Sequence, residues 1–380
     1  MDFNLTEEQQ MIQQAARDFA QAELLPGVIE RDDQQKFPHD AVKKMGEMGF
    51  LGMMVDPKYG GAGLDSVSYV LAMEEIAKVD ASAAVVMSVN NSLVCAGLEK
   101  FCNEEQKMKY LKPLASGEVI GAFALSEPEA GSDATSQSTT AEDKGDYYLL
   151  NGTKNWITNG GNATYYIVIA QTNPEKKHKG INAFIVEKGW EGFVVGKKED
   201  KLGIRGSDTH SLMFTDVKVP KENRIGEDGF GFNFAMAVLN GGRIGIASQA
   251  LGIASGAYEL SLKYAKERKS FGTEIINHQA IAFKLADMHT SIMAARMLIY
   301  KAAAEKDEGK DISESGAMAK LYASQVAMDT TIEAVQIHGG YGYVKEYHVE
   351  RMMRDAKITQ IYEGTSEIQK IVISRSIAKK

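Results

Sequence analysis

The chain has 380 residues, of which 44% are hydrophobic and 25% charged, with a formal net charge of −8 at pH 7. This length exceeds one ordinary hydrophobic core and predicts two or three packed subdomains. Lys and Arg are spread through the sequence without a basic block, so nucleic acid is not an expected partner. No apolar run stands out as long enough to cross a membrane, so a membrane is not expected as a partner either.

The first ten residues read MDFNLTEEQQ, with neither a basic and apolar leader nor an Arg-rich amphipathic segment. This start favours a bacterial cytoplasmic location, with the mitochondrial matrix as the alternative for a processed eukaryotic form. Cys95 and Cys102, the two cysteines, would lie about 10 Å apart along a helix, which argues against a mutual disulfide. The scattered histidines show no ligand spacing, and no metal is expected.

Residues 1–120 have a helical pattern. Thr6 and Gln9 have the spacing of a capping box, which predicts a helix from about residue 7 to 24. Helical periodicity recurs to Leu111, interrupted by the glycine-rich loop KYGGAGLD at 58–65. We expect an N-terminal α-helical domain over this range.

Short apolar runs replace the helical pattern over residues 121–229. These runs lie at 147–150, 156–158, 165–170, 181–186, 193–196 and 211–219. Asn151-Gly152 and Asn159-Gly160 are typical of tight turns between strands. The pattern predicts a middle antiparallel β domain, built as a small sandwich or barrel.

Long helical patterns return over residues 230–380. Apolar residues recur there at three- and four-residue spacing, as in Leu285, Met288, Ile292, Ala295 and Ile299. Breaks are predicted at Phe271-Gly272, at Gly309 and at GGYGY, residues 339–343. This predicts a C-terminal four-helix bundle and an overall α+β fold with helices on both sides of the β domain.

Five segments, in order along the chain, resemble signatures of the acyl-CoA dehydrogenase family. They read FALSEPEAGSDA at 123–134, WITNGG at 156–161, RKSFG at 268–272, QIHGGYGY at 336–343 and MRDAKITQIYEGTSEIQ at 353–369. No G-x-G-x-x-G or Walker loop in a βαβ setting competes with them. The resemblance covers essentially the whole chain and implies an FAD-dependent enzyme that dehydrogenates acyl-CoA thioesters.

The same resemblance implies two groups of FAD-binding residues. The first group comprises Phe123, Leu125, Ser126, Ser132, Trp156, Ile157, Thr158, Thr365 and Glu367. Of these, Phe123, Leu125 and Trp156 would contact the flavin, as would Ser126 and Thr158, which would bond to the edges of its ring. The second group corresponds to positions that bind the pyrophosphate and adenosine of a neighbouring subunit's FAD, and comprises Arg268, Gln279, Gln336, Gly339 and Gly340. The second group implies an oligomer, and the family a homotetramer.

Glu363, in IYEGTSEIQ, is the expected catalytic base for the substrate's α-proton. A water-poor pocket would raise its pKa and make it a better base toward a carbon acid. By the resemblance, its backbone N–H and a flavin ribityl hydroxyl would hold the thioester carbonyl. Some relatives place the base directly before an arginine that corresponds to Arg243, where this chain has Gly242. Ser366 and Gln369 have capping-box spacing, so a carboxylate at 363 could instead simply favour a helix N-terminus.

The residues expected to contact acyl-CoA are Ser132, Asn240, Arg243 and Gly364. Asn240 stands where many relatives have Asp, and Glu129 stands where a small residue is common in the flavin signature. Three stretches resemble the short-chain, or butyryl-CoA, branch of the family: VMSVNNSL at 86–93, GKKEDKLGIRGS at 196–207 and GRIGIASQALGIA at 242–254. The expected reaction is the conversion of butyryl-CoA to crotonyl-CoA.

Several alternatives stay open from the sequence. One methylene changes selectivity by only about 1 to 3 kcal/mol, which leaves medium-chain and branched-chain acyl groups as alternatives. An acyl-CoA oxidase would share the scaffold and differ in its reaction with oxygen. A non-catalytic relative would use the scaffold for binding, although the net charge argues against one that binds DNA. For a dehydrogenase, the resemblance implies an electron-transferring flavoprotein as the electron acceptor.

Overall fold

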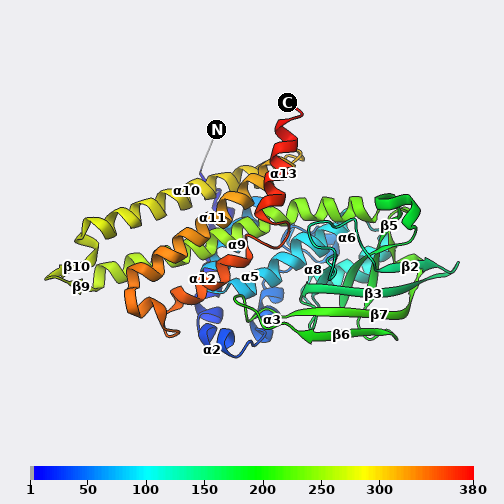
Figure 1. Cartoon of the computed structure of the whole chain (residues 1–380), viewed down its shortest axis with the longest axis horizontal. Coiled ribbons are helices and arrows are strands. Elements are labelled where there is room, and N and C mark those ends of the chain that lie inside the picture. Colours follow the sequence, from blue (N-terminus) through cyan, green and yellow to red (C-terminus); the bar gives the residue numbers. More distant parts are fainter. Residues whose placement is uncertain (1–3) are drawn as a thin grey trace.

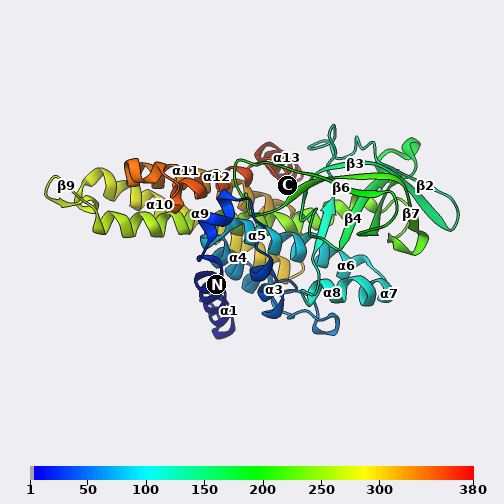
Figure 2. The same cartoon turned by 90° about the horizontal axis from the view of Figure 1, so that it is seen from below.

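The computed structural model describes residues 4–380 and shows an elongated molecule with a β sheet at one end (Figure 1). The helices α9 (Gly231–Glu267), α10 (Gln279–Asp307) and α11 (Ser313–His338) pack together along the long axis. The N-terminal helices pack against this bundle from one side, and α4 (Ser66–Val79) lies on α9 (Figure 2). The α+β prediction is confirmed.

The chain before the sheet is helical, as predicted. The capping box is present, with Gln9 N donating to Thr6 Oγ1 at 3.2 Å and Thr6 N donating to Gln9 Oε1 at 3.1 Å. Besides α4, the elements are α1 (Glu7–Phe19), η1 (Ala20–Leu24), α2 (Val28–Asp33), α3 (His39–Glu47), η2 (Pro57–Tyr59), α5 (Ala81–Ser88), η3 (Val89–Cys95), α6 (Ala96–Phe101), α7 (Glu104–Gln106), η4 (Lys107–Leu111) and α8 (Lys112–Ala115).

One helical stretch corrects the expectation that no apolar run is long enough to cross a membrane. Ala81–Phe101 has 21 residues and meets the length and composition of a spanning helix. The fold buries 94% of its most apolar window. Core helices of globular proteins pass the same test, because a helix surrounded by protein can be apolar on every side.

The middle of the chain forms an eight-stranded sheet with the order β6-β7-β3-β2-β4-β5-β8, and β1 paired to β4. Most neighbours are antiparallel, as predicted, but β1 runs parallel to β4, and β2 meets β4 in parallel at one residue pair. The elements are β1 (Gly121–Ala124), β2 (Thr140–Asp143), β3 (Tyr147–Thr158), β4 (Tyr165–Gln171), η5 (Pro174–Gly180), β5 (Ile181–Glu187), β6 (Phe193–Lys198), β7 (Thr209–Pro220), η6 (Lys221–Asn223) and β8 (Arg224–Ile225).

The predicted turn at Asn151-Gly152 is wrong. β3 continues through these residues, and its pairing with β7 shifts register at Gly152. A Cβ on Gly152 would lie 2.6 Å from Thr139 Oγ1, so the glycine permits a close approach of Thr139 instead of reversing the chain. The predicted turn at Asn159-Gly160 is present.

The C-terminal bundle is present and includes α13 as a short helix beyond α9–α12. The predicted break at Phe271-Gly272 is the tip of a two-strand hairpin at the end of the bundle opposite the sheet (Figure 1). Both tip residues have positive φ, at 51° and 83°, as a tight hairpin turn requires. The remaining elements are β9 (Lys269–Ser270), β10 (Thr273–Glu274), η7 (Ile275–Asn277), η8 (Gly339–Tyr343), α12 (His348–Ile358) and α13 (Ser366–Ile377).

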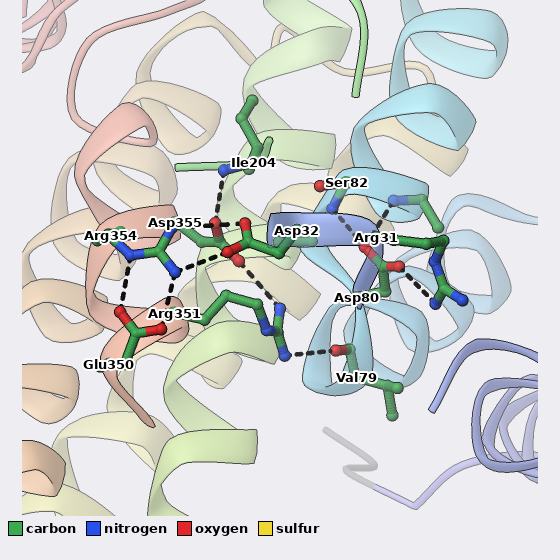
Figure 3. A network of polar contacts seen from close by, with 12 residues as sticks. Arg31, Asp32, Val79, Asp80, Ser82, Ile204, Glu350, Arg351, Arg354 and Asp355 are labelled. Atoms are coloured by element: carbon green, nitrogen blue, oxygen red, sulfur yellow. Dashed lines mark hydrogen bonds and ion pairs between the residues drawn. The ribbon is translucent and has the colours of Figure 1, made fainter. Parts of the chain in front are cut away.

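A polar cluster joins α2, the loop before β7 and α12 (Figure 3). Arg354 donates to Asp32 at 2.7 Å across 322 positions of the chain. Asp355 accepts a hydrogen bond from the backbone N–H of Ile204 and pairs with Arg351 at 3.0 Å. We call these residues, with Glu350, the α2–α12 cluster. It connects the N-terminal helices, the β domain and the segment that leads to Glu363.

Candidate active site

A cavity of about 560 Å³ lies where the sheet, the N-terminal helices and the C-terminal bundle meet. Its lining is mostly apolar, with a few polar groups, which is the usual character of a ligand site. The structure brings a large part of the predicted site to this cavity, namely Phe123, Leu125, Ser126, Ser132, Trp156, Ile157, Thr158, Arg243, Glu363 and Gly364.

Trp156 is placed at the cavity by a second irregularity of β3. The pairing with β7 shifts register between Lys154 and Ile157, and Trp156 has a φ of 63°. A bulge redirects a side chain, and positive φ is uncommon for a bulky residue. The side chain of Trp156 is left 61% exposed. With Phe123 it gives the cavity an exposed aromatic surface of the kind that binds a planar ligand.

A buried ion pair lies behind this surface. Lys154 Nζ lies 2.7 Å from Glu127 Oε1 and donates to the carbonyl of Leu125 at 3.0 Å. Although burial alone would raise it, the pKa of Glu127 is held at about 2 by the Lys154 ammonium and by hydrogen bonds from Ser138 and Thr139. The pair joins the segment after β1 to β3. Sequence reasoning missed it, although each residue lies within or beside a flavin-like signature.

Glu363 extends into the cavity from the turn between α12 and α13. Its φ is 51° and that of Gly364 is 93°, a left-handed conformation that is strained for glutamate. Burial raises the pKa of Glu363 to about 7, although Lys320 and Arg243 act in the opposite direction. Within residues 4–380, neither its buried Oε2 nor its backbone N–H has a hydrogen-bond partner. Both groups are therefore available to a ligand.

The start of α13 differs from the prediction. Its N-cap is Thr365, whose hydroxyl accepts from Ile368 N at 3.3 Å, so the predicted capping box of Ser366 and Gln369 is wrong. Gln369 instead donates from Nε2 to the carbonyl of Gly364 at 2.8 Å. The left-handed turn at Glu363 and Gly364 directly precedes the helix, so the N-cap is Thr365, one residue before the predicted Ser366. Neither Thr365 nor Glu367 lines the cavity.

Arg243 contributes a cation to the cavity. The residue is 6% exposed, and Nη1 donates to Asn240 Oδ1 at 2.7 Å. Its buried Nε has no partner among the described residues. Burial lowers the pKa of Arg243, an effect that Glu363 opposes. Asn240 does not line the cavity; it orients Arg243 from one helical turn away.

The second predicted group lies elsewhere. Arg268, Gln279, Gln336, Gly339 and Gly340 lie at the ends of α9, α10 and α11, near the β9–β10 hairpin (Figure 1). The rings of Tyr264 and His338 stack at 4.3 Å and connect two of these helix ends. Arg268 lies about 37 Å along α9 from Arg243, from the 1.5 Å helical rise per residue. This group is far from the cavity of its own chain.

Sequence reasoning also missed Lys320 of α11. Its side chain is fully buried, and Nζ donates to the carbonyl of Gly364 at 2.6 Å. The available signal was a lysine in the apolar run AMAKLYA, at a position where helical spacing faces the core.

Comparison with known proteins gives three family matches in chain order. "Acyl-CoA dehydrogenase, N-terminal domain" matches residues 6–118, "Acyl-CoA dehydrogenase, middle domain" matches 122–217 and "Acyl-CoA dehydrogenase, C-terminal domain" matches 229–378. A short-chain specific acyl-CoA dehydrogenase of Clostridium acetobutylicum is 52% identical over 377 residues, which cover 99% of this chain and 100% of that protein.

Two solved structures are similar over their whole length. Butyryl-CoA dehydrogenase from Megasphaera elsdenii has 50% identity and a TM-score of 0.98, with 100% of both chains covered. A chain in a structure described as the electron transferring flavoprotein of Acidaminococcus fermentans has 53% identity and a TM-score of 0.99, again with 100% of both covered.

Proposed function

The chain belongs to the acyl-CoA dehydrogenase family, and we propose that it oxidises short-chain acyl-CoA, with butyryl-CoA as substrate, crotonyl-CoA as product and FAD as cofactor. The observation that carries this proposal is Glu363, a buried carboxylate whose pKa of about 7 suits a base at neutral pH. Its unpartnered Oε2 lies at a cavity that is otherwise largely apolar.

The cavity residues fit an FAD. Trp156, Phe123 and Leu125 provide apolar contacts for a planar ring, while the hydroxyls of Ser126 and Thr158 provide hydrogen-bonding groups for its polar edges. The exposed indole of Trp156 and its bulged backbone are features that a bound ring would explain. We assign the isoalloxazine ring to this wall, with Ser132 and Ile157 also beside it.

The chain's own groups then divide the reaction between them. Glu363 removes the α-proton of the thioester and keeps it on its carboxylate. The free N–H of Glu363 donates to the thioester carbonyl, where negative charge develops as the proton leaves. A bound FAD, held by the residues of this wall, would supply the acceptor for the hydride of the β-carbon, so that the acyl chain would lose one proton and one hydride and gain a double bond. Arg243 adds positive charge near the carboxylate. Ser132 and Gly364 line the cavity and are proposed to contact acyl-CoA, while Asn240 is proposed to act through its hydrogen bond with Arg243.

We propose that an apolar wall of the cavity, formed by Val85, Val89 and Leu93 and here called the end wall, limits the length of the acyl chain. Val85, Val89 and Leu93 recur every four residues, present one helical face to the cavity and are at most 5% exposed. Tyr362 lines the same cavity, and its hydroxyl donates to Gln249 of α9. In this proposal the branched side chains and the tethered ring of Tyr362 bound the acyl chain, which favours butyryl-CoA over medium-chain substrates.

The two far-apart residue groups support an oligomer, and the family supports a homotetramer. We propose that Arg268, Gln279, Gln336, Gly339 and Gly340 bind the pyrophosphate and adenosine of a neighbouring subunit's FAD, since they lie far from the cavity of their own chain. Arg is suited to a pyrophosphate because its guanidinium can form paired hydrogen bonds with phosphate oxygens. Thr365 and Glu367 are assigned to FAD by their positions in the segment that follows Gly364. Electrons leave to an electron-transferring flavoprotein, as the relatives support.

The test is the anaerobic visible spectrum of the purified protein before and after addition of butyryl-CoA. Bleaching of a flavin band by butyryl-CoA, and weaker bleaching by octanoyl-CoA and isobutyryl-CoA, is the expected result. A protein that binds FAD but bleaches with no acyl-CoA would support the non-catalytic alternative. Fast reoxidation of the bleached protein by oxygen would support the oxidase, and failure to bind FAD would overturn the proposal.

A further inference from the structure

Lys320 is a buried lysine without a carboxylate partner, and burial lowers its pKa to about 8, so that it is an ammonium at pH 7. Its side chain is 0% exposed, and within residues 4–380 it forms no ion pair within 4.0 Å. A buried charge is costly unless it is paired or hydrogen-bonded. Its hydrogen bond is to the backbone carbonyl of Gly364, at 2.6 Å. An apolar side chain at position 320 could not donate this hydrogen bond to the turn.

The Gly364 carbonyl is the point where two helices hold the Glu363 turn. Lys320 reaches it from α11, and Gln369 reaches it from α13 at 2.8 Å. Gln369 also donates to the carbonyl of Glu363 at 3.3 Å. Both carbonyls of the turn therefore have hydrogen-bond partners, whereas the N–H of Glu363 has none among the described residues. The positive φ values of Glu363 and Gly364 require such support, because the conformation is unfavourable for a glutamate.

Lys320 also acts on the carboxylate through its charge. The groups that influence Glu363 come from several elements: Lys320 on α11 and Arg243 on α9 lower the pKa of Glu363, and burial raises it. Tyr69 of α4 and the adjacent Tyr362 are neutral neighbours whose own pKa values are raised. Of the two cations, Lys320 lowers the pKa of Glu363 more than Arg243 does. Removal of Lys320 should therefore raise the pKa of Glu363.

We propose that Lys320 is a positioning residue that holds the Glu363–Gly364 turn through the Gly364 carbonyl and favours the ionised carboxylate of Glu363. This inference rests on the proposed role of Glu363 as the base. It assigns to α11 a function in the active site, although Lys320 does not line the cavity. Because Lys320 does not contact the substrate in this proposal, its effect on catalysis is exerted through Glu363.

The test compares Lys320→Met with Lys306→Met. Lys306 is a matched control because it is another lysine whose pKa burial lowers, and it donates to Met54 Sδ at 3.1 Å instead of to the turn. The first readout is the rate of flavin bleaching by butyryl-CoA as a function of pH. We expect Lys320→Met to move the midpoint upward by about one pH unit, as the loss of a nearby opposite charge predicts. We expect Lys306→Met to leave the midpoint unchanged.

The second readout does not depend on turnover. The infrared carbonyl band of protonated Glu363, identified as the band missing in Glu363→Gln, should titrate at a higher pH in Lys320→Met than in the wild-type holoenzyme. If the wild-type protein is not bleached by any acyl-CoA, the proposed function fails, while this titration still decides the role of Lys320.

A second variant keeps the test decisive if Lys320→Met does not fold. Lys320→Gln retains a donor for the Gly364 carbonyl without the charge, and we expect it to show the same upward shift, while Lys320→Arg restores the wild-type midpoint. An unchanged midpoint in both neutral variants would overturn the inference. An equal shift in Lys306→Met would overturn it as well, because the effect would then not depend on contact with the turn.

Discussion

Gly242 of α9 lies directly against the carboxylate of Glu363: a Cβ at position 242 would come within 2.1 Å of Oε2. It would also lie 2.8 Å from Leu93 Cδ2, so that little space remains on either side. The position before Arg243 and the position of Glu363 therefore face the same point of the cavity. A glycine at the first leaves room for the carboxylate from the second.

Gly242→Ala should displace the carboxylate of Glu363. A shift of about 1 Å at a reacting group can lower the rate about 100-fold, and a fall of this order is expected in the rate of flavin bleaching by butyryl-CoA. Gly241→Ala is the matched control, because nothing lies within 4 Å of its Cβ position. The control should retain its rate and unfold at a slightly higher temperature, since alanine stabilises a helix by about 1 kcal/mol over glycine. A wild-type rate in Gly242→Ala would contradict the placement.

Glu363→Gln should retain FAD and acyl-CoA binding while it loses turnover. The amide is nearly the same size as the carboxylate but cannot accept the α-proton, so we expect kcat to fall by about 10² to 10⁴. Steady-state turnover and a binding titration with butyryl-CoA, measured on the same preparation, separate the two effects. Substantial turnover with unchanged binding would show that another group is the base.

The pH dependence of the wild-type protein should follow Glu363. The base acts in its ionised form, so the rate of bleaching should rise with pH through a midpoint near the pKa of about 7. The folded-state pKa is raised from the ordinary value of 4.5, so folding favours the protonated form, and the contribution to stability is lost as pH rises through about 7. Glu363→Gln should therefore gain stability over the wild type at pH 8, by up to about 3 kcal/mol, and little at pH 4. Thermal unfolding at both pH values checks this difference.

Glu127→Gln should destabilise the β domain and weaken FAD binding. The substitution leaves the Lys154 ammonium buried without its carboxylate, a change that costs about 3 to 5 kcal/mol. Glu142→Gln breaks an exposed pair with Lys144, 2.6 Å apart, and should leave the urea midpoint nearly unchanged. Urea unfolding of both variants gives the comparison. In the wild type, the pKa of Glu127 is lowered to about 2, so its stabilisation is present above about pH 4.5 and is lost as the pH falls toward 2.

Val89→Ala should extend the acyl range of the cavity. The substitution removes two methyl groups from the end wall, and a gain of about tenfold in kcat/KM for hexanoyl-CoA relative to butyryl-CoA is expected. Val94→Ala is the control, because Val94 is buried in the same helical stretch without lining the cavity. Equal substrate preference in the two variants would show that Val89 does not limit chain length.

Local sequence patterns predicted the parts of the site that lie within one segment. Trp156, Ser126 and Glu363 each belong to a short signature, and the structure places all three at the cavity. The contacts that support them join distant segments: Lys154 meets Glu127 across 27 positions and Lys320 meets Gly364 across 44. These pairings depend on strand register and helix packing, which residue spacing does not encode.

The predicted turn at Asn151-Gly152 and the predicted cap of α13 also differ from the structure. Asn151-Gly152 has the composition of a hairpin turn, but the close approach of Thr139 decides its conformation. The cap of α13 moved from Ser366 to Thr365 because the left-handed turn at Glu363 sets where the helix can begin. At Gly152 a contact with another segment outweighs the local preference of the residues, and at α13 the preceding backbone turn does so.

The α2–α12 cluster also has a consequence for the order in which the chain can fold during synthesis. Asp32 leaves the ribosome about 322 residues before Arg354, and Glu74 about 222 residues before its own partner Arg296. Until Arg354 and Arg296 are synthesised, Asp32 and Glu74 lack these ion-pair partners. Until α9 is synthesised, α4 and α5 lack the helix against which they pack. The N-terminal helices therefore complete their packing only when nearly the whole chain has been made. Truncation before α12 would remove a part of their core together with Glu363.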